Sequence, residues 1–256
     1  MKNTKDLIFS KEQHTAIIKI NRPPNNFFDA ELIKQIADLL ENIDLDNSLR
    51  SVILCSEGKN FCAGADFSKS SFKENSNTYS KLYDQAIRLF KTKKPIISII
   101  QGAAVGGGLG LALATDFRIG SKETKFSANF SKLGFHQGFG ITVTLPKLIG
   151  KQNAKMLLLT GRRIKGEEAY KIGLLDYLMD QKNLMQKAIN LAFEINSSGP
   201  LGVQSIRKTL DKGLYEEVET ILKIEYSEQV RLKDTEDFKE GIKASLERRE
   251  PNFKNL

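Results

Sequence analysis

Short runs of β-branched and other apolar residues recur in the first half of the chain, at Ala16–Ile20, Ser51–Cys55 and Ile96–Ile100. Runs of this length and composition predict buried strands. Between the first two runs, apolar residues follow the helical period, and Asp29 is placed to accept the N-cap hydrogen bond of that helix. The apolar positions of this helix are Leu32, Ile33, Ile36, Leu39, Leu40 and Ile43. Strands that alternate with helices predict an α/β fold with largely parallel pairing.

The pattern changes in the last quarter of the chain. Strand signals vanish from about residue 183, and helical stretches are expected near 183–196, 201–212, 215–232 and 235–249. The Ser197-Ser198-Gly199-Pro200 break separates an expected core over 1–198 from a C-terminal helical region over 199–256. Earlier in the chain, the polar stretch 68–80 predicts a loop that leads into a helix.

The segment Ile96–Ala114 carries no charge and is long enough to cross a membrane. Its glycines and Pro95 instead favour a buried strand, a tight turn and a buried helix. The N-terminus, MKNTKDLIFSKEQH, lacks the apolar core of a secretion signal. We therefore expect a cytoplasmic protein with reduced thiols and no membrane partner.

Composition excludes several classes of protein. The chain has 256 residues, of which 40% are hydrophobic and 27% charged, which argues against disorder. Two cysteines are too few for a disulfide scaffold. Two cysteines and two histidines also argue against a structural zinc site, so no metal is expected. The formal charge of +8 favours an anionic partner. A solvated basic surface is the simplest explanation of the positive charge, and a phosphate-binding site is the second. Nucleic acid is not expected as a partner.

Two glycine-containing turns each follow a predicted strand, over Gly58–Asp66 and Gln101–Gly110. Backbone N–H groups gather where a strand passes through a loop into a helix, and they can hold an anion or a developing oxyanion. Close packing of a helix against a strand is the alternative explanation for the glycines. A Walker loop is excluded because no Lys-Ser or Lys-Thr follows, and a G-x-G-x-x-G motif because Leu111 and Leu113 stand at the third glycine position.

Several segments together resemble the crotonase (enoyl-CoA hydratase/isomerase) superfamily, in the family's order and at its spacing, over nearly the whole chain. Each segment alone is weak, but the ordered set is specific. The segments are Asn21-Arg22-Pro23, Phe61–Asp66, Lys94–Ile97 with Gln101-Gly102 and Gly106–Gly108, Leu159–Ile164, and Glu168–Leu174.

The resemblance implies a crotonase-like (ClpP/crotonase) spiral of ββα units with a C-terminal helical trimerisation region. A homotrimer or a dimer of trimers is expected, because the C-terminal helices carry more apolar positions than a small helical tail can bury alone. These positions are Leu210, Leu214, Val218, Ile221 and Leu222.

The resemblance also implies an acyl-CoA ligand in fatty acid metabolism, and no cofactor besides the coenzyme A that the substrate carries. By position, the N–H groups of Ala65 and Gly107 would hold the thioester carbonyl and stabilise an enolate. The substrate-binding positions would be Ala63, Asp66, Gly106, Phe130 and Gln137, with the adenine near Ala63–Asp66.

The chain departs from the family pattern at its acid/base positions. Hydratases of the family carry two glutamates, but here the matching positions are Gly110 and Phe130. A related isomerase subgroup uses an aspartate at a position that is Gly138 here. His136, in the same loop, is the remaining candidate for proton transfer. The alternatives are that His136 contacts the substrate or caps a turn.

These departures favour a lyase or isomerase that stabilises an enolate without the glutamate pair. Decarboxylation of a malonyl-type acyl-CoA needs no base to begin, whereas isomerisation or hydrolysis would need His136 to move a proton. Phe130, Phe139, Thr142 and Val143 suggest an apolar acyl pocket. The alternatives are an ordinary enoyl-CoA hydratase that uses an unrecognised acid/base group, a non-catalytic acyl-CoA-binding protein, and an RNA-binding relative suggested only by the charge.

Overall fold

The computed structural model describes residues 3–66 and 76–255, without the side chains of 76–80, so most of the predicted loop at 68–80 lies outside it. Its main sheet has the order β1-β2-β3-β4-β6-β9. These strands are β1 (Leu7–Glu12), β2 (Thr15–Ile20), β3 (Ser51–Ser56), β4 (Ile96–Ile100), β6 (Phe117–Gly120) and β9 (Tyr177–Leu178). The neighbours from β2 to β9 pair in parallel, which confirms the predicted largely parallel sheet. β1, which the sequence did not predict, pairs antiparallel with β2.

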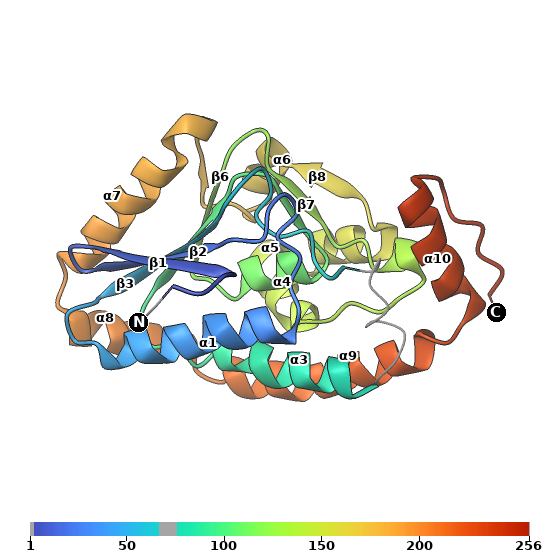
Figure 1. Cartoon of the computed structure of the whole chain (residues 1–256), viewed down its shortest axis with the longest axis horizontal. Helices are drawn as coiled ribbons and strands as arrows, with labels where there is room; N and C mark the ends of the chain where they lie inside the picture. The colour runs from blue at the N-terminus through green and yellow to red at the C-terminus, as the bar shows by residue number, and fades with distance from the viewer. Residues whose placement is uncertain (1–2, 67–75, 256) are drawn as a thin grey trace.

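The central strands of the main sheet, β3 and β4, are buried on both faces. Helix α1 (Ala30–Leu45) lies on one side of the sheet and α7 (Leu184–Asn196) on the other (Figure 1). Along β3, Val52 and Leu54 join the core on the α1 side, whereas Ile53 and Cys55 pack with α7. Because both faces are covered, the parallel strands read as continuous apolar runs rather than as alternating ones.

Helix α1 is fixed at both ends by side chains that the sequence places there. The Asp29 carboxylate accepts from the Leu32 N–H, and all of the predicted apolar positions of the helix are buried, which confirms the predicted N-cap and face. At the other end, Nζ of Lys94 donates to the carbonyl oxygens of Ile43 and Asp46. Lys94, part of a motif typical of the family, therefore caps a helix here.

A second, smaller sheet lies beside the main one, with the order β5-β7-β8. Its strands are β5 (Ala103–Val105), β7 (Lys125–Ser127) and β8 (Arg163–Lys165). The uncharged segment 96–114 thus forms β4, then β5, then α4 (Gly107–Leu113), with one more short strand than predicted. No helix among the described residues is long and apolar enough to cross a membrane.

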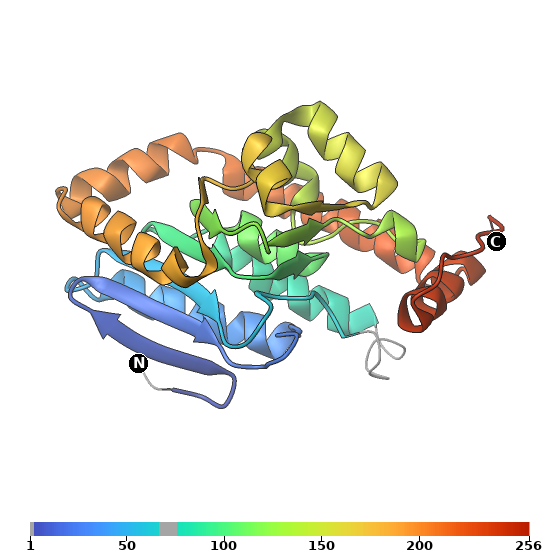
Figure 2. The same cartoon turned by 90° about the horizontal axis from the view of Figure 1, so that it is seen from above.

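The remaining helices surround the sheets. They are α3 (Ser76–Leu89), α5 (Ile141–Thr160), α6 (Gly166–Lys171), α8 (Pro200–Leu210), α9 (Leu214–Leu232) and α10 (Glu236–Glu247), with short 3-10 turns at Ser131–Leu133 and Gln181–Asn183. The four helices from α7 onward match the predicted stretches closely. α9 packs against α3 and α5, and α10 packs against the turn at Ser131–Leu133. Figure 2 shows α10 at one end of the molecule, far from the N-terminus.

Candidate active site

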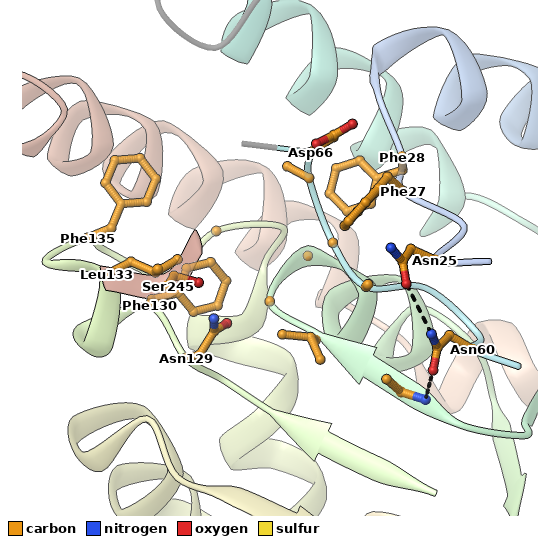
Figure 3. A pocket seen from close by; sticks show the side chains of 18 of the residues that line it. Asn25, Phe27, Phe28, Asn60, Asp66, Asn129, Phe130, Leu133, Phe135 and Ser245 are labelled. Carbon is orange, nitrogen blue, oxygen red and sulfur yellow. Dashed lines mark hydrogen bonds between the residues drawn. The ribbon is translucent and has the colours of Figure 1, made fainter. Parts of the chain in front are cut away.

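A cavity of about 800 Å³ opens between the two glycine-containing turns and the C-terminal helices. One wall holds Asn25, Phe27, Phe28, Asn60 and Asp66, and the facing wall holds Asn129, Phe130, Leu133, Phe135 and Ser245 (Figure 3). Leu82 and Tyr83 of α3, Gln229 of α9, and Ile242, Ser245 and Leu246 of α10 complete the lining. Segments far apart in the sequence therefore build one site.

The two turns are joined by backbone hydrogen bonds. Cys62 donates to the carbonyl of Ala103, and Val105 donates back to the carbonyl of Cys62, each at 3.0 Å. Gly64 has a φ of +88°, and a Cβ built on it would lie 2.7 Å from the Val105 oxygen and 3.7 Å from the Gly107 nitrogen. The chain around Ala65 therefore lies directly against the start of α4, and only glycine fits at position 64.

Ala65 and Gly107, the predicted enolate-binding residues, both line this cavity. Within the described part of the chain, neither backbone N–H has a hydrogen-bond acceptor. Gly107 is the first residue of α4, where N–H groups have no partner inside the helix. A Cβ on Gly107 would lie 2.3 Å from the ring of Phe28, so close packing also requires this glycine. The structure thus brings two unpaired donors to one cavity.

At two of the three acid positions of the family, the structure places aromatic rings. A Cβ on Gly110 would lie 2.6 Å from Cβ of Phe139, so the Phe139 side chain fills that space. Phe130 is 8% exposed and lines the cavity. The ring of Phe28 lies near that of Phe139, with centroids 5.6 Å apart. Two of the suggested acyl-pocket residues, Phe130 and Phe139, therefore line the cavity.

The third acid position is filled by polar groups. A Cβ on Gly138 would lie 2.1 Å from the hydroxyl oxygen of Tyr83 and 2.7 Å from Nε2 of Gln229. All three residues line the cavity. The phenol of Tyr83 from α3 and the amide of Gln229 from α9 thus occupy the space that a side chain at position 138 would fill.

His136 and Gln137 are not among the residues that line the cavity. Nδ1 of His136 lies 2.8 Å from the carbonyl oxygen of Gln137, and Nε2 of Gln137 donates to Oγ1 of Thr142 at 3.0 Å. Thr142 and Val143, which were also suggested to line an apolar acyl pocket, lie outside the lining of this cavity. The loop carrying His136 faces α9, where Nε2 of Gln229 donates to the carbonyl oxygen of His136 at 2.9 Å.

The other predicted substrate positions lie on the cavity wall. Ala63, Asp66 and Gly106 line it, and Asp66 is the only carboxylate among the lining residues that the structure describes. Gly106 has a φ of +55°, and a Cβ on it would lie 3.5 Å from Oδ1 of Asn129. Asn129 was not predicted, because no motif in the sequence marks it.

Positive charge gathers around the cavity. Lys59, Lys125, Arg163 and Arg248 line it and are exposed, and none of them forms an ion pair with a described residue. Beyond the net charge, this cluster could not be predicted from the sequence, because the four side chains come from four separate segments. They can hold an anionic group at the cavity surface.

Two other kinds of chemistry find no support in the described residues. No group of His, Cys, Asp and Glu side chains there could hold a metal ion. Both cysteines are buried, and burial raises the pKa of the Cys62 thiol to about 12. A protonated thiol is a poor nucleophile, so Cys62 is a packing residue.

Comparison with known proteins agrees with this geometry. The model of the enoyl-CoA hydratase/isomerase family matches residues 10–256. The chain is 36% identical over 251 residues to YngF of Bacillus subtilis, whose name assigns it to the enoyl-CoA hydratases/isomerases, with 96% of each chain covered. It is 32% identical to crotonyl-CoA hydratase of Syntrophomonas wolfei, with 97% of each chain covered.

The fold also matches solved structures. The enoyl-CoA hydratase/isomerase of Pseudoalteromonas atlantica superposes with a TM-score of 0.89 at 28% identity, over 98% of this chain and 100% of that one. The spiral crotonase fold is therefore established for this chain. The chain belongs to the enoyl-CoA hydratase/isomerase family of the crotonase superfamily, whose enzymes act on acyl-CoA thioesters.

Proposed function

We propose that this protein stabilises a thioester enolate between the N–H groups of Ala65 and Gly107, without the family's water-activating glutamate pair. The observation that carries the proposal is a cavity with two unpaired backbone donors, next to acid positions filled by Phe139 and Phe130. Reactions that need no carboxylate pair, such as decarboxylation, isomerisation or hydrolysis, are favoured over hydration.

Decarboxylation of a malonyl-type acyl-CoA fits these walls best. The thioester oxygen accepts from both N–H groups, the bond between the α-carbon and the carboxylate breaks, and its electron pair moves into the enolate. A carboxylate beside Phe28, Phe130 and Phe139 is poorly solvated, whereas carbon dioxide is neutral, so loss of the charge is favourable. Each backbone donor is typically worth about 3 kcal/mol of transition-state stabilisation.

Coenzyme A would enter past the exposed basic side chains. Lys59, Lys125, Arg163 and Arg248 would pair with its phosphates, and the adenine would lie near Ala63–Asp66. The enzyme itself needs no further cofactor for this chemistry, because the substrate brings the coenzyme A.

Hydration is the second candidate, because the relatives include named hydratases such as those of Syntrophomonas wolfei and Clostridium acetobutylicum, each 32% identical. In that case a group other than the two missing carboxylates would have to activate water. His136 lies outside the cavity lining, so a candidate would have to come from the polar lining residues, such as Asn129 or Ser245.

The test is incubation with malonyl-CoA, methylmalonyl-CoA, crotonyl-CoA and a 3-enoyl-CoA, followed by mass spectrometry of the products and measurement of carbon dioxide. We expect carbon dioxide and the shortened acyl-CoA from at least one malonyl-type substrate. Water addition to crotonyl-CoA with no carbon dioxide release would favour the second candidate instead.

The variant Ala65→Pro tests the donor itself, because it removes an N–H that bonds to no described residue. We expect turnover to fall about 10²–10³-fold while acyl-CoA still binds. Ala63→Pro is the contrasting variant, since the Ala63 N–H donates to the carbonyl oxygen of Asn25 at 2.9 Å. Loss of this hydrogen bond should lower the stability of the fold. Unchanged turnover in folded Ala65→Pro protein would remove Ala65 from the mechanism.

A further inference from the structure

A buried phenol lies at the acyl cavity where the family's third acid position is empty. Tyr83 of α3 is 8% exposed and lines the cavity. Its hydroxyl oxygen lies 2.1 Å from the place that a Cβ on Gly138 would occupy, so any side chain at position 138 would displace it. Of the three acid positions, Gly138 is the only one whose space holds an ionisable hydrogen donor, since aromatic rings fill the spaces at Gly110 and Phe130.

The phenol is held in a fixed direction. Tyr83 donates to Oε1 of Gln229 at 2.6 Å, and Nε2 of Gln229 donates to the carbonyl oxygen of His136 at 2.9 Å. Gln229 is 4% exposed, so water competes little for these bonds. The ring of Tyr83 packs against that of Tyr226, with centroids 6.4 Å apart. α9 therefore fixes the ring and the hydroxyl oxygen at the cavity wall, and rotation about the C–O bond turns the proton from Gln229 toward the cavity.

We infer that Tyr83 is a catalytic residue that delivers the proton to the α-carbon of the enolate. This inference rests on the proposed enolate chemistry, and it names the acid that the missing carboxylates leave unassigned. The phenol O–H bond breaks, a C–H bond forms at the α-carbon, and the enolate electron pair returns to restore the thioester. The resulting tyrosinate takes a proton from water, so the net proton comes from solvent.

The direction of this transfer is favourable. A phenol has an ordinary pKa of about 10 and is a far stronger acid than the α-carbon of a thioester, so the proton moves toward the carbanion. Decarboxylation makes this step necessary, because the carbon that loses carbon dioxide must gain a proton. A donor fixed on one side of the cavity also makes protonation stereospecific.

The experiment compares wild type, Tyr83→Phe and Tyr226→Phe in D₂O with two substrates, methylmalonyl-CoA and butyryl-CoA. It measures carbon dioxide, the rate at which deuterium enters the α-carbon, and the configuration of the deuterated propionyl-CoA. Tyr226→Phe is the matched control, because it removes a hydroxyl from the adjacent ring, which is absent from the cavity lining. Melting curves and CoA binding establish that each variant is folded.

We expect wild type and Tyr226→Phe to give one configuration of deuterated propionyl-CoA. Tyr83→Phe should still release carbon dioxide but give a racemic product. Exchange into butyryl-CoA runs the same step in reverse, with the tyrosinate form of Tyr83 taking the α-proton, and should fall at least about 10²-fold in this variant. The inference would be overturned if Tyr83→Phe gave the same single product configuration and the same exchange rate as wild type. It would also be overturned if no wild-type product contained deuterium from the solvent. If no carbon dioxide forms but exchange depends on Tyr83, decarboxylation is wrong and the role of Tyr83 stands.

Discussion

The side chain of Phe139 determines what residue 110 can be. Phe139 is 1% exposed and has a φ of +64°, and its Cβ, Cγ and Cδ1 lie beside Gly110. A Cβ on Gly110 would meet Phe139 atoms at 2.6–2.9 Å. Gly110 is therefore required by packing, and a glutamate there would need a smaller residue at 139. A larger side chain at position 110 and a phenylalanine at position 139 therefore compete for the same space.

This competition predicts the effect of Gly110→Ala. An alanine inside a helix usually stabilises a protein by about 1 kcal/mol relative to glycine. Here the substitution should destabilise by about 1–3 kcal/mol, because overpacking outweighs helix propensity. In a Phe139→Gly background the same substitution should be neutral or stabilising. Urea unfolding of wild type, the two single variants and the double variant measures the coupling energy between residues 110 and 139. An equal loss of unfolding free energy from Gly110→Ala in both backgrounds would contradict this prediction.

At the scale of single residues, the sequence predicted the cavity-lining glycine turns better than the cavity-lining polar side chains. Ala65, Gly107 and the positions without carboxylates could be named from the sequence because they belong to contiguous motifs. Tyr83 and Gln229 could not be found, because they reach the site from α3 and α9 and no local spacing links them. His136 is a titratable side chain in the predicted loop, but the path of the backbone places it outside the cavity lining, which no sequence pattern indicates.

Among the elements, α9 holds the loop that carries Gly138 and Phe139. Glu225 of α9 is fully buried and accepts from the N–H groups of Gly140 and Thr142 at 2.8 and 3.0 Å, and from the Thr142 hydroxyl at 2.6 Å. Burial raises the pKa of Glu225, although these donors act against the rise. A single carboxylate thus ties the start of α5 to the C-terminal helices.

Glu225→Gln should destabilise the protein by about 1–3 kcal/mol at neutral pH, because one amide oxygen cannot replace two carboxylate oxygens. The pKa of Glu225 is higher in the folded state than in the unfolded one. Its titration therefore adds stability below about pH 4, and this contribution is lost as the pH rises through the raised pKa. The gap between wild type and Glu225→Gln should be larger at pH 5 than at pH 8 in urea unfolding. A gap that is larger at pH 8 than at pH 5 would show that folding lowers the pKa of Glu225 instead.

The long elements were predictable and the short ones were not. α1 and the four helices after residue 183 carry several turns of apolar period, and β2, β3 and β4 are apolar runs. β5, β7, β8 and β9 have two or three residues each, which is too short for any periodicity. Their pairing depends on distant segments, so the second sheet was invisible in the sequence.

For the whole molecule, the exposed apolar residues point to self-association. Leu201, Ile206 and Leu210 of α8 are 80%, 63% and 81% exposed. Val218 and Leu222 were expected to contribute to this surface, but they are buried beside Tyr83 within the same chain. The two side chains therefore do not contribute to an exposed surface as predicted, whereas α8 leaves an apolar surface uncovered.

We predict a homotrimer or a dimer of trimers in solution. Light scattering at micromolar concentration should give three or six times the mass of the chain. Because an apolar interface resists salt, the mass should persist at high ionic strength. A monomer at that concentration would contradict this prediction, and Leu210→Lys should lower the mass if α8 lies in the interface.

The basic side chains around the cavity predict a salt-dependent affinity for coenzyme A. The dissociation constant should rise between low and high salt, because exposed ion pairs are screened. Lys125→Ala with Arg163→Ala should weaken binding and flatten the salt dependence. Lys182→Ala is a suitable control, since Lys182 does not line the cavity. Binding that is independent of salt would contradict phosphate pairing at these residues.

The most direct test of the account is the rate at which the wild type hydrates crotonyl-CoA, measured beside the crotonyl-CoA hydratase of Syntrophomonas wolfei. Gly110 and Phe130 offer no carboxylate to orient or deprotonate water, and such groups contribute about 10²–10⁴-fold. The account predicts hydration at least about 10³-fold slower than that of the comparison enzyme, with crotonyl-CoA still bound at the N–H groups of Ala65 and Gly107. Hydration at the rate of the comparison enzyme would contradict it, because another group would then be activating the water.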